Sequence, residues 1–353
     1  MTIAPSRSAP DPVEGFIRSY LTDPGLPFNA DLRRGAHTPF VVTAAKRRGL
    51  RVVEVEEGFY FFDGVVCVGG IHRMVPTLCG SVASEVAKSK IATKTLLSEA
   101  RVATPPWMVA GPDDYRAAAD FMRMEGGPIV LKPSRGRGGS GVITGITNVT
   151  GLKEAWSRQR ADRNFPLIAE KQVAGVDIRA YVVGGRVVAA TTRIQPFVVG
   201  DGATSLKDLV RSKQNIRETN GYLSRMPIVA DPARLRRSGL TMESIPPADQ
   251  VVVLNDAANI HQGGENVDIT DALNPSLAAL AVAAARAIPG MGCGGVDLIA
   301  DVPADDSSAA VLEVNAAANI SVHHIPAYGE PVEVAAAIVE EMLVSARETE
   351  RRN

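Results

Sequence analysis

Three residues near the end of the chain have side chains that suit a hard metal ion. Asp297 lies in a short apolar run, and Glu313 and Asn315 lie two positions apart in a second apolar run. Both runs favour β-strands and residues 305–308 predict a turn, so we expect a hairpin with these side chains on one face. Two carboxylates and an amide oxygen, without His or Cys, indicate Mg²⁺ rather than Zn²⁺. Ion pairing or helix capping is the alternative role for such acids.

A glycine-rich segment in the first half of the chain offers donors for phosphate. A strand-like run that includes Lys132 leads into residues 134–141 (SRGRGGSG), and a second β-favouring run follows. The glycine pattern of a dinucleotide fold must lead into a helix, which this segment does not. We therefore expect a flap over nucleotide phosphates, with backbone N–H groups, Arg135, Arg137 and Ser140 as donors and Lys132 as a point charge. A surface hairpin loop is the alternative.

Two lysines share one face of a helix that is expected over residues 86–100. Lys90 and Lys94 are four residues apart, which places them on the same side. A solvated lysine face is the favoured explanation on this pattern alone.

Four more charged residues follow the glycine-rich segment. Glu170 and Asp177 are seven residues apart around a turn, a spacing that suits contacts to adenine and ribose or, alternatively, a polar connector. Arg179 and Arg193 lie on opposite arms of a hairpin expected over residues 178–194 and centred on a Gly-Gly turn. Without the register, the sequence leaves open whether these two arginines share a face.

The composition excludes several classes of partner. The chain has 353 residues, with 38 Lys and Arg against 39 Asp and Glu, so its net charge gives no reason to expect nucleic acid or an anionic membrane as a partner. We expect no membrane span. The three cysteines lack metal-ligand spacing and are expected to be buried free thiols in a reducing cytoplasm.

The order of the candidate residues resembles that of the ATP-grasp superfamily of carboxylate–amine ligases. The residues that carry this resemblance are Lys90, Lys132, the glycine-rich segment, Glu170, Asp177, Asp297, Glu313 and Asn315. Residues 199–202, 263–271, 295–297 and 312–317 look most like the ATP-grasp portion of cyanophycin synthetases, and the resemblance covers roughly residues 65–340. The Mur-ligase-like region of those enzymes is not found, so synthesis of cyanophycin itself is not expected.

The resemblance implies an α/β (α+β) ATP-grasp fold with the nucleotide held between two lobes. Residues 1–85 are then a small N-terminal α/β lobe, residues 86–173 a central lobe with the glycine-rich flap, and residues 174–353 a C-terminal lobe with the metal site. ATP and two Mg²⁺, for which Mn²⁺ can substitute, are the implied cofactors.

The resemblance also assigns roles by position. ATP phosphates fall to Lys90, Lys132 and the flap residues Ser134, Arg137, Gly138, Gly139 and Ser140. Adenine falls to Glu170, Lys171 and Val173, ribose to Asp177, and the metals to Asp297, Glu313 and Asn315. Arg193 or Arg179 is the candidate oxyanion donor, because Gly295 stands where D-alanine–D-alanine ligases have an arginine.

The implied activity is formation of an amide or peptide bond between amino acids or small peptides through an acyl phosphate. Gly138–Ser140 and Ala317–Asn319 depart from the cyanophycin synthetase pattern, which leaves the substrates and any base open. An ATP-binding regulatory module without turnover and a ligase that modifies a protein or carrier are the alternatives. A homodimer is expected from the frequency of such assemblies alone.

Overall fold

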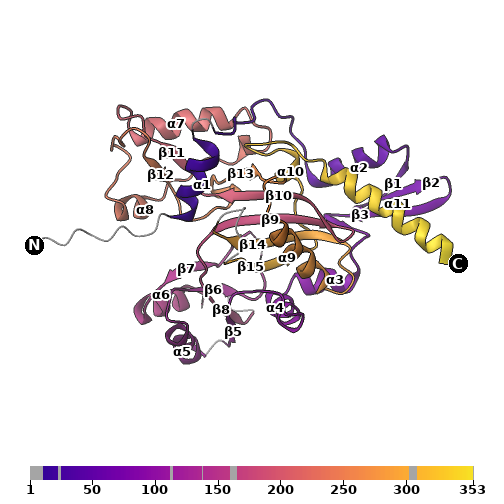
Figure 1. Ribbon diagram of the computed structural model, residues 1–353, viewed down its shortest axis with the longest axis horizontal. Coiled ribbons are helices and arrows are strands. Elements are labelled where there is room, and N and C mark those ends of the chain that lie inside the picture. The colour runs from indigo at the N-terminus through magenta and orange to yellow at the C-terminus, as the bar shows by residue number, and fades with distance from the viewer. Residues whose placement is uncertain are drawn as a thin grey trace, which may run out of the picture.

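The computed structural model describes residues 11–22, 25–111, 114–136, 138–159, 165–301 and 308–352. Within these ranges the strands form two four-stranded sheets, one five-stranded sheet and one two-stranded ribbon, as Figure 1 shows. The five-stranded sheet lies between the two four-stranded sheets.

The first four-stranded sheet is antiparallel and has the order β1-β2-β3-β4. Its strands are β1 (Arg51–Val55), β2 (Gly58–Asp63), β3 (Val66–His72) and β4 (Val75–Pro76). The helices α2 (His37–Arg47) and α11 (Val334–Arg352) pack against each other, and α11 also packs on β3, at the end of the molecule where the chain terminates (Figure 1). The first helix, α1 (Pro12–Leu21), lies apart from this sheet and contacts the strands β9 (Val176–Val183) and β12 (Val251–Val253).

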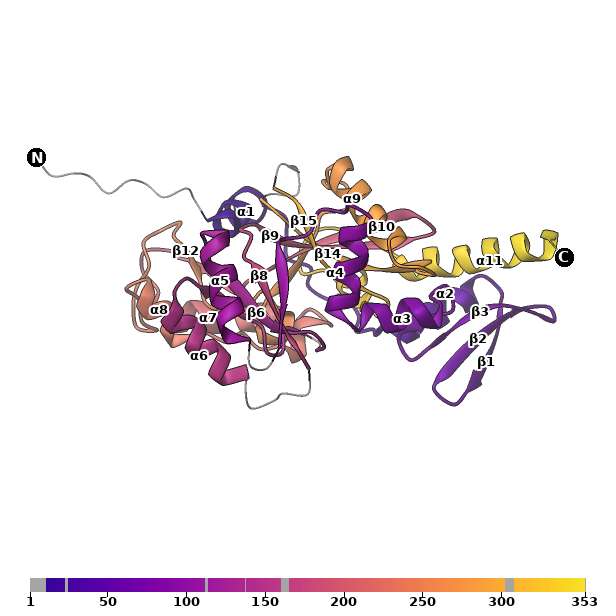
Figure 2. The same ribbon diagram turned by 90° about the horizontal axis from the view of Figure 1, so that it is seen from below.

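The second four-stranded sheet has the order β5-β8-β6-β7 and its own apolar core. It consists of β5 (Trp107–Ala110), β6 (Ile129–Pro133), β7 (Ile143–Ile146) and β8 (Leu167–Lys171). The helices α5 (Tyr115–Glu125) and α6 (Val149–Gln159) pack against it, as Figure 2 shows. The glycine-rich segment joins β6 to β7, so the predicted arrangement of a glycine loop between antiparallel strands is confirmed.

The five-stranded sheet has the order β13-β10-β9-β14-β15. Its strands are β9 (Val176–Val183), β10 (Arg186–Ile194), β13 (Glu265–Asp268), β14 (Cys293–Ala300) and β15 (Ala310–Asn315). Gly184 and Gly185 have φ values of 57° and 78°, which a two-residue turn of this hairpin requires, and the predicted hairpin is confirmed. The helix α9 (Pro275–Arg286) packs on β9, β10, β14 and β15.

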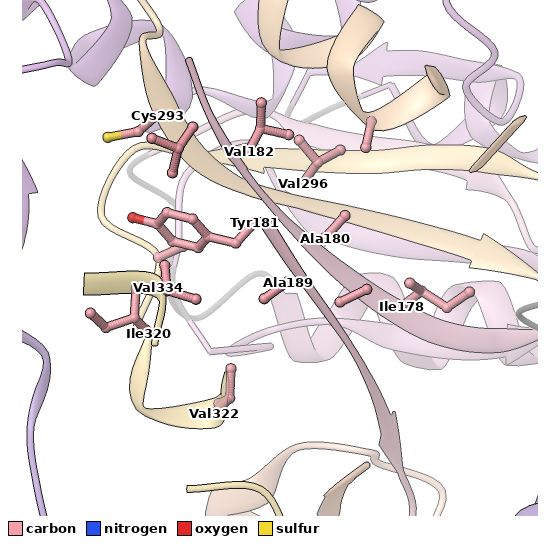
Figure 3. Packing of buried hydrophobic residues seen from close by; sticks show 14 of the residues in the cluster. Ile178, Ala180, Tyr181, Val182, Ala189, Cys293, Val296, Ile320, Val322 and Val334 are labelled. Carbon is pink, nitrogen blue, oxygen red and sulfur yellow. The ribbon is translucent and has the colours of Figure 1, made fainter. Parts of the chain in front are cut away.

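The largest apolar core surrounds this sheet. Figure 3 shows buried side chains of β9, among them Ala180, Tyr181 and Val182, packing with Val296 of β14 and Val334 of α11. This core also extends to α10 (Ser321–His324), which precedes α11. The sheet that carries the candidate metal residues is therefore held from several sides.

The elements between β10 and β13 form a middle subdomain with an apolar core of its own. It includes β11 (Phe197–Val199), α7 (Leu206–Arg217), α8 (Pro232–Arg237) and β12 (Val251–Val253), with 3₁₀ turns at Leu223–Arg225 and Ile260–Gln262. A small apolar core of its own fixes α7 and α8 against the β11-β12 ribbon.

The single helix expected over residues 86–100 is wrong. The structure has two helices, α3 (Ser81–Ala87) and α4 (Lys90–Glu99). Ser89 interrupts them because it adopts an extended backbone conformation and its hydroxyl caps α4 by accepting from the Ala92 N–H. The expectation of three buried cysteines is also wrong for Cys67, which is exposed, whereas Cys79 and Cys293 are buried free thiols. None of the described helices is both long and apolar enough to cross a membrane.

Candidate active site

The metal candidates meet on one face of the five-stranded sheet. Asp297 on β14 lies directly opposite Glu313 on β15, and Gly295 lies opposite Asn315, so the predicted pairing is confirmed. Asn315 Nδ2 is 2.9 Å from Glu313 Oε1 and 3.3 Å from Asp297 Oδ2. Residues 302–307, which hold most of the predicted turn, lie outside the described residues.

The register also places the two arginines on this face. Asp297 of β14 lies opposite Arg179 of β9. Asp177, which is also on β9, lies opposite Arg193 of β10. Since residues 177 and 179 are two apart on one strand, all four side chains point the same way. Arg179 donates from Nε and Nη2 to the two carboxylate oxygens of Asp297, each at 2.7 Å. Arg193 donates from Nε and Nη2 to Asp177 Oδ1 at 3.0 and 2.6 Å, and its Nη2 is 3.4 Å from Asp297.

The balance between burial and these ion pairs shifts the pKa values of the two aspartates in opposite directions. Burial favours the neutral form of Asp297, but the charges of Arg179 and Arg193 outweigh it and hold its pKa at about 2. Burial raises the pKa of Asp177, and Arg193 offsets that effect only in part.

Lys90 connects this face to the glycine-rich segment. Its Nζ is 3.5 Å from Glu313 Oε2 and 3.4 Å from the carbonyl oxygen of Gly136. Its backbone N–H donates to the carbonyl of Ser134, which is buried, at 2.9 Å. Lys90 at the first turn of α4 is thus positioned between the candidate phosphate loop and the candidate metal ligands.

The exposed part of the glycine-rich segment contacts the middle subdomain. Asn259 Nδ2 donates to the carbonyl oxygen of Gly138 at 2.7 Å. Gly139 and Ser140 are exposed beside this contact, and Arg137 lies outside the described residues. The segment therefore spans from α4 to Asn259.

A buried charged triad lies behind the flap, and sequence reasoning missed one of its members. Glu170 of β8 accepts from Lys132 of β6 at 2.9 Å and also pairs with Lys94 of α4. Lys94 Nζ further donates to Thr104 Oγ1 at 2.8 Å, and Thr104 donates to the carbonyl of Val311 on β15. The triad thus ties α4 to both sheets.

Lys94 is buried in the core. The sequence favoured a solvated helix face for Lys90 and Lys94, and this explanation is wrong for Lys94. Its side chain is 1% exposed, and burial lowers its pKa to about 8, an effect that Glu170 only partly offsets. The available signal was helical spacing: Lys90, Lys94 and Leu97 recur at positions i, i+4 and i+7, which continues the apolar stripe of α4.

The residues that the resemblance connects to adenine lie at the end of β8. The Glu170 carboxylate faces the two lysines, Lys171 Nζ is 3.3 Å from Glu125, and Val173 is half-buried just after the strand. The backbone from Glu170 to Val173 leads directly to Asp177 at the start of β9.

Two further residues border the site: Gly295, which the sequence had already connected to the candidate arginines, and Tyr222, which the sequence did not indicate. A Cβ at Gly295 would lie 2.5 Å from Ala318 Cβ and 3.5 Å from Arg179 Cδ, so a larger residue there would clash and the neighbouring space belongs to Arg179. The charges of Arg179 and Arg193 act on Tyr222 of the middle subdomain. Burial raises its pKa, and the two arginines oppose that rise.

The donor set fits a hard divalent cation. Asp297, Glu313 and Asn315 present two carboxylates and an amide on one face, and such oxygens are the ligands that Mg²⁺ prefers. Among the described residues, no group of three His, Cys, Asp or Glu side chains could hold a metal ion. A three-residue set on this face would therefore have to include the Asn315 amide, and two carboxylates with an amide are not the His and Cys ligands of a typical zinc site.

The sequence of the chain is similar to those of known proteins. No family model matches the chain. It is 30% identical over 323 residues to the cyanophycin synthetase of Trichormus variabilis. This alignment covers 88% of the present chain and 35% of the synthetase. It is 31% identical over 224 residues to a glutathione biosynthesis bifunctional protein of Pasteurella multocida, covering 61% of this chain and 29% of that protein. The chain spans about a third of the length of the curated relatives it matches.

A solved structure shows the same fold. The crystal structure of a bifunctional glutathione synthetase from Pasteurella multocida superposes with a TM-score of 0.65 at 22% identity, covering 88% of this chain and 44% of that one. The helices and antiparallel sheets described above are those of an α+β ATP-grasp fold, as the sequence predicted. The chain belongs to the ATP-grasp superfamily, and its similarity to cyanophycin synthetases extends over most of its length.

Proposed function

We propose that the chain is an ATP-dependent carboxylate–amine ligase that joins amino acids or small peptides by an amide bond, through an acyl phosphate, with release of ADP and phosphate. One observation carries the proposal: Lys90 lies within 3.5 Å of both the glycine-rich segment and Glu313, so the candidate phosphate loop and the candidate metal ligands meet at one place. The relatives named above are synthetases, which supports the same class of reaction.

The nucleotide is proposed to lie between the flap and the five-stranded sheet. Lys90, Lys132 and the backbone of residues 138–140 hold its phosphates, and the backbone of residues 170–173 lies along adenine. Both donors of Arg193 bind Asp177 Oδ1, so Oδ2 is the oxygen that we assign to a ribose hydroxyl. Positioning and charge neutralisation of this kind are what phosphoryl transfer requires of a protein.

Asp297, Glu313 and Asn315 are proposed to hold Mg²⁺, which neutralises phosphate charge when bound. Both Asp297 oxygens that would hold the metal now accept from Arg179, so with a metal there the guanidinium beside Gly295 would be free of that carboxylate. We assign the oxyanion role to Arg179 on this ground, and to Arg193 the task of holding Asp177 and balancing Asp297. Two metals, replaceable by Mn²⁺, remain part of the proposal.

We also propose that the chain divides into three lobes, at residues 1–85, 86–173 and 174–353. The protein is proposed to be cytoplasmic and to form a homodimer. The substrates are small amino acids or peptides, and neither nucleic acid nor a membrane is involved. The balance of 38 basic and 39 acidic residues supports this choice of partners.

An ADP-release screen tests the proposal. The purified protein, ATP and Mg²⁺ are incubated with pairs of amino acids, and products are identified by mass spectrometry. We expect ADP only when a carboxylate donor and an amine acceptor are both present, with a product lighter than their sum by one water. Tight ATP binding without ADP for any pair would instead support a regulatory module, and a mass shift on an added protein would support a modifying ligase.

A further inference from the structure

A cavity outside the ATP site lies between α7, β11 and the N-terminal part of the chain. Its volume is about 330 Å³, at the lower end of the range for small-molecule sites. Leu21, Phe28, Phe197 and Tyr328 supply apolar walls, and Lys213 and Arg217 of α7 supply the charged part of the lining. A mostly apolar wall with a few convergent polar groups is typical of sites for small organic ligands.

The charged part of this cavity carries an excess of positive charge. Glu265, which is fully buried, binds both cations: its Oε1 is 2.9 Å from Arg217 Nη1, and its Oε2 is 2.9 Å from Lys213 Nζ. The hydroxyl of Tyr328 donates to the same Oε2 at 3.3 Å. Two cations therefore share one carboxylate, and a buried charge without a partner is costly.

Both cations retain donors that this network does not use. Lys213 has three N–H donors, and its Nζ lies 3.2 Å from the centre of the Phe197 ring while it pairs with Glu265. Arg217 has no exposed surface, and its Nε is buried without a hydrogen-bond partner among the described residues. Burial also lowers the pKa of Lys213, and Glu265 only partly opposes this. The cluster of Lys213, Arg217 and Glu265 thus has one positive charge that no carboxylate balances.

The register separates this cavity from the ATP site. Glu265 and Asn266 are neighbours on β13, opposite Ile194 and Arg193 of β10 respectively. Since successive strand residues point to opposite faces, Glu265 and its cations lie on the other face of the sheet from Arg193. A ligand in the cavity would not occupy the nucleotide position.

We propose that this cavity is a second binding site, for a small amphipathic monocarboxylate. The carboxylate binds the Lys213 ammonium with Arg217 behind it, and brings the charge of the cluster to zero. The apolar part of the ligand packs against Phe28, Phe197 and Tyr328. A matched amine would add a positive charge to the excess and is rejected.

Calorimetric titration of the full chain without ATP tests this site. The probe is 3-phenylpropionate, and 3-phenylpropylamine is its oppositely charged match. We expect saturable binding of the carboxylate with one equivalent per chain and none of the amine. Lys213→Met should weaken binding by about tenfold or more, because a charge-assisted hydrogen bond is lost. Lys207→Met, an exposed lysine on the same helix, should leave it unchanged.

A second variant tests whether loss of probe binding in Lys213→Met reflects the site or misfolding. Ile216 is 52% exposed at the rim, so Ile216→Trp should fill the cavity, abolish probe binding and leave the melting temperature near that of the wild type. The site is wrong if the wild type does not bind the probe saturably, if both variants bind it normally, or if ATP competes with it. None of these measurements needs turnover, so they stand apart from the test of the ligase proposal.

Discussion

The two charged clusters of the candidate active site differ in burial and in balance. On the five-stranded sheet, Lys90, Arg179 and Arg193 face Asp177, Asp297 and Glu313, and the charges cancel. Several of these side chains keep access to solvent: Arg193 is 19% exposed and Asp177 30%. Behind the flap, Lys94 and Lys132 share Glu170, none is more than 8% exposed, and one positive charge remains.

This difference suggests a division of labour. In the balanced and partly open cluster every charge has a partner, and a metal ion held by Asp297 would have to replace Arg179 there. A buried cluster with excess positive charge has no internal partner for that charge and favours an incoming anion such as phosphate.

The largest effect is expected at Glu313. Glu313→Gln keeps the size and removes the charge, so it should abolish ADP release to below about 1% of wild type while the protein stays folded. Circular dichroism and an ADP-release assay measure the two properties. Glu330→Gln, at an exposed position, is the control. Full activity of Glu313→Gln would remove the metal assignment.

The next effect separates the two arginines. Arg179→Lys should lower kcat by about 100-fold, as expected for loss of an oxyanion donor, with little change in the KM for ATP. Arg193→Lys should act mainly on the KM for ATP, because it loosens Asp177. Steady-state kinetics of both variants decides between them, and the reverse pattern would exchange their proposed roles.

A smaller effect is expected at Lys94. Lys94→Met removes the excess charge and leaves Lys132 and Glu170 as a matched pair, so the KM for ATP should rise about tenfold while the unfolding temperature stays close to that of the wild type. Lys88→Met, at an exposed position two residues before α4, is the control. An unchanged KM would show that the triad is only structural.

The smallest effect is a pH dependence. Burial lowers the pKa of Lys94 from 10.5 to about 8, so its charge is lost as the pH rises through 8 and the KM for ATP should rise a few-fold between pH 7.5 and 9.5. The unfolded chain holds this proton until about pH 10.5, so stability relative to Lys94→Met should increase between pH 8 and 10.5. Lys94→Met should show a flat KM profile; a parallel rise in the variant would assign the titration elsewhere.

The sequence by itself determined the hairpins and the faces of their residues. Alternation on both sides of Gly184-Gly185, and the apolar runs around Asp297 and Glu313, are local signals, and the side chains of a strand alternate between its two sides. The three candidate oxygen ligands and the family resemblance rested on such local patterns.

Only the tertiary structure decided which partners these side chains meet. The shared face of Arg179 and Arg193 depends on the register between β9, β10 and β14, and Asp297 is 118 positions from the arginine that it binds. The burial of Lys94 depends on α4 docking against β15 and the Glu170 strand together, and the charges of Arg179 and Arg193 act on Tyr222, which belongs to another segment of the chain. These contacts join elements far apart in the chain, so no local pattern specifies them.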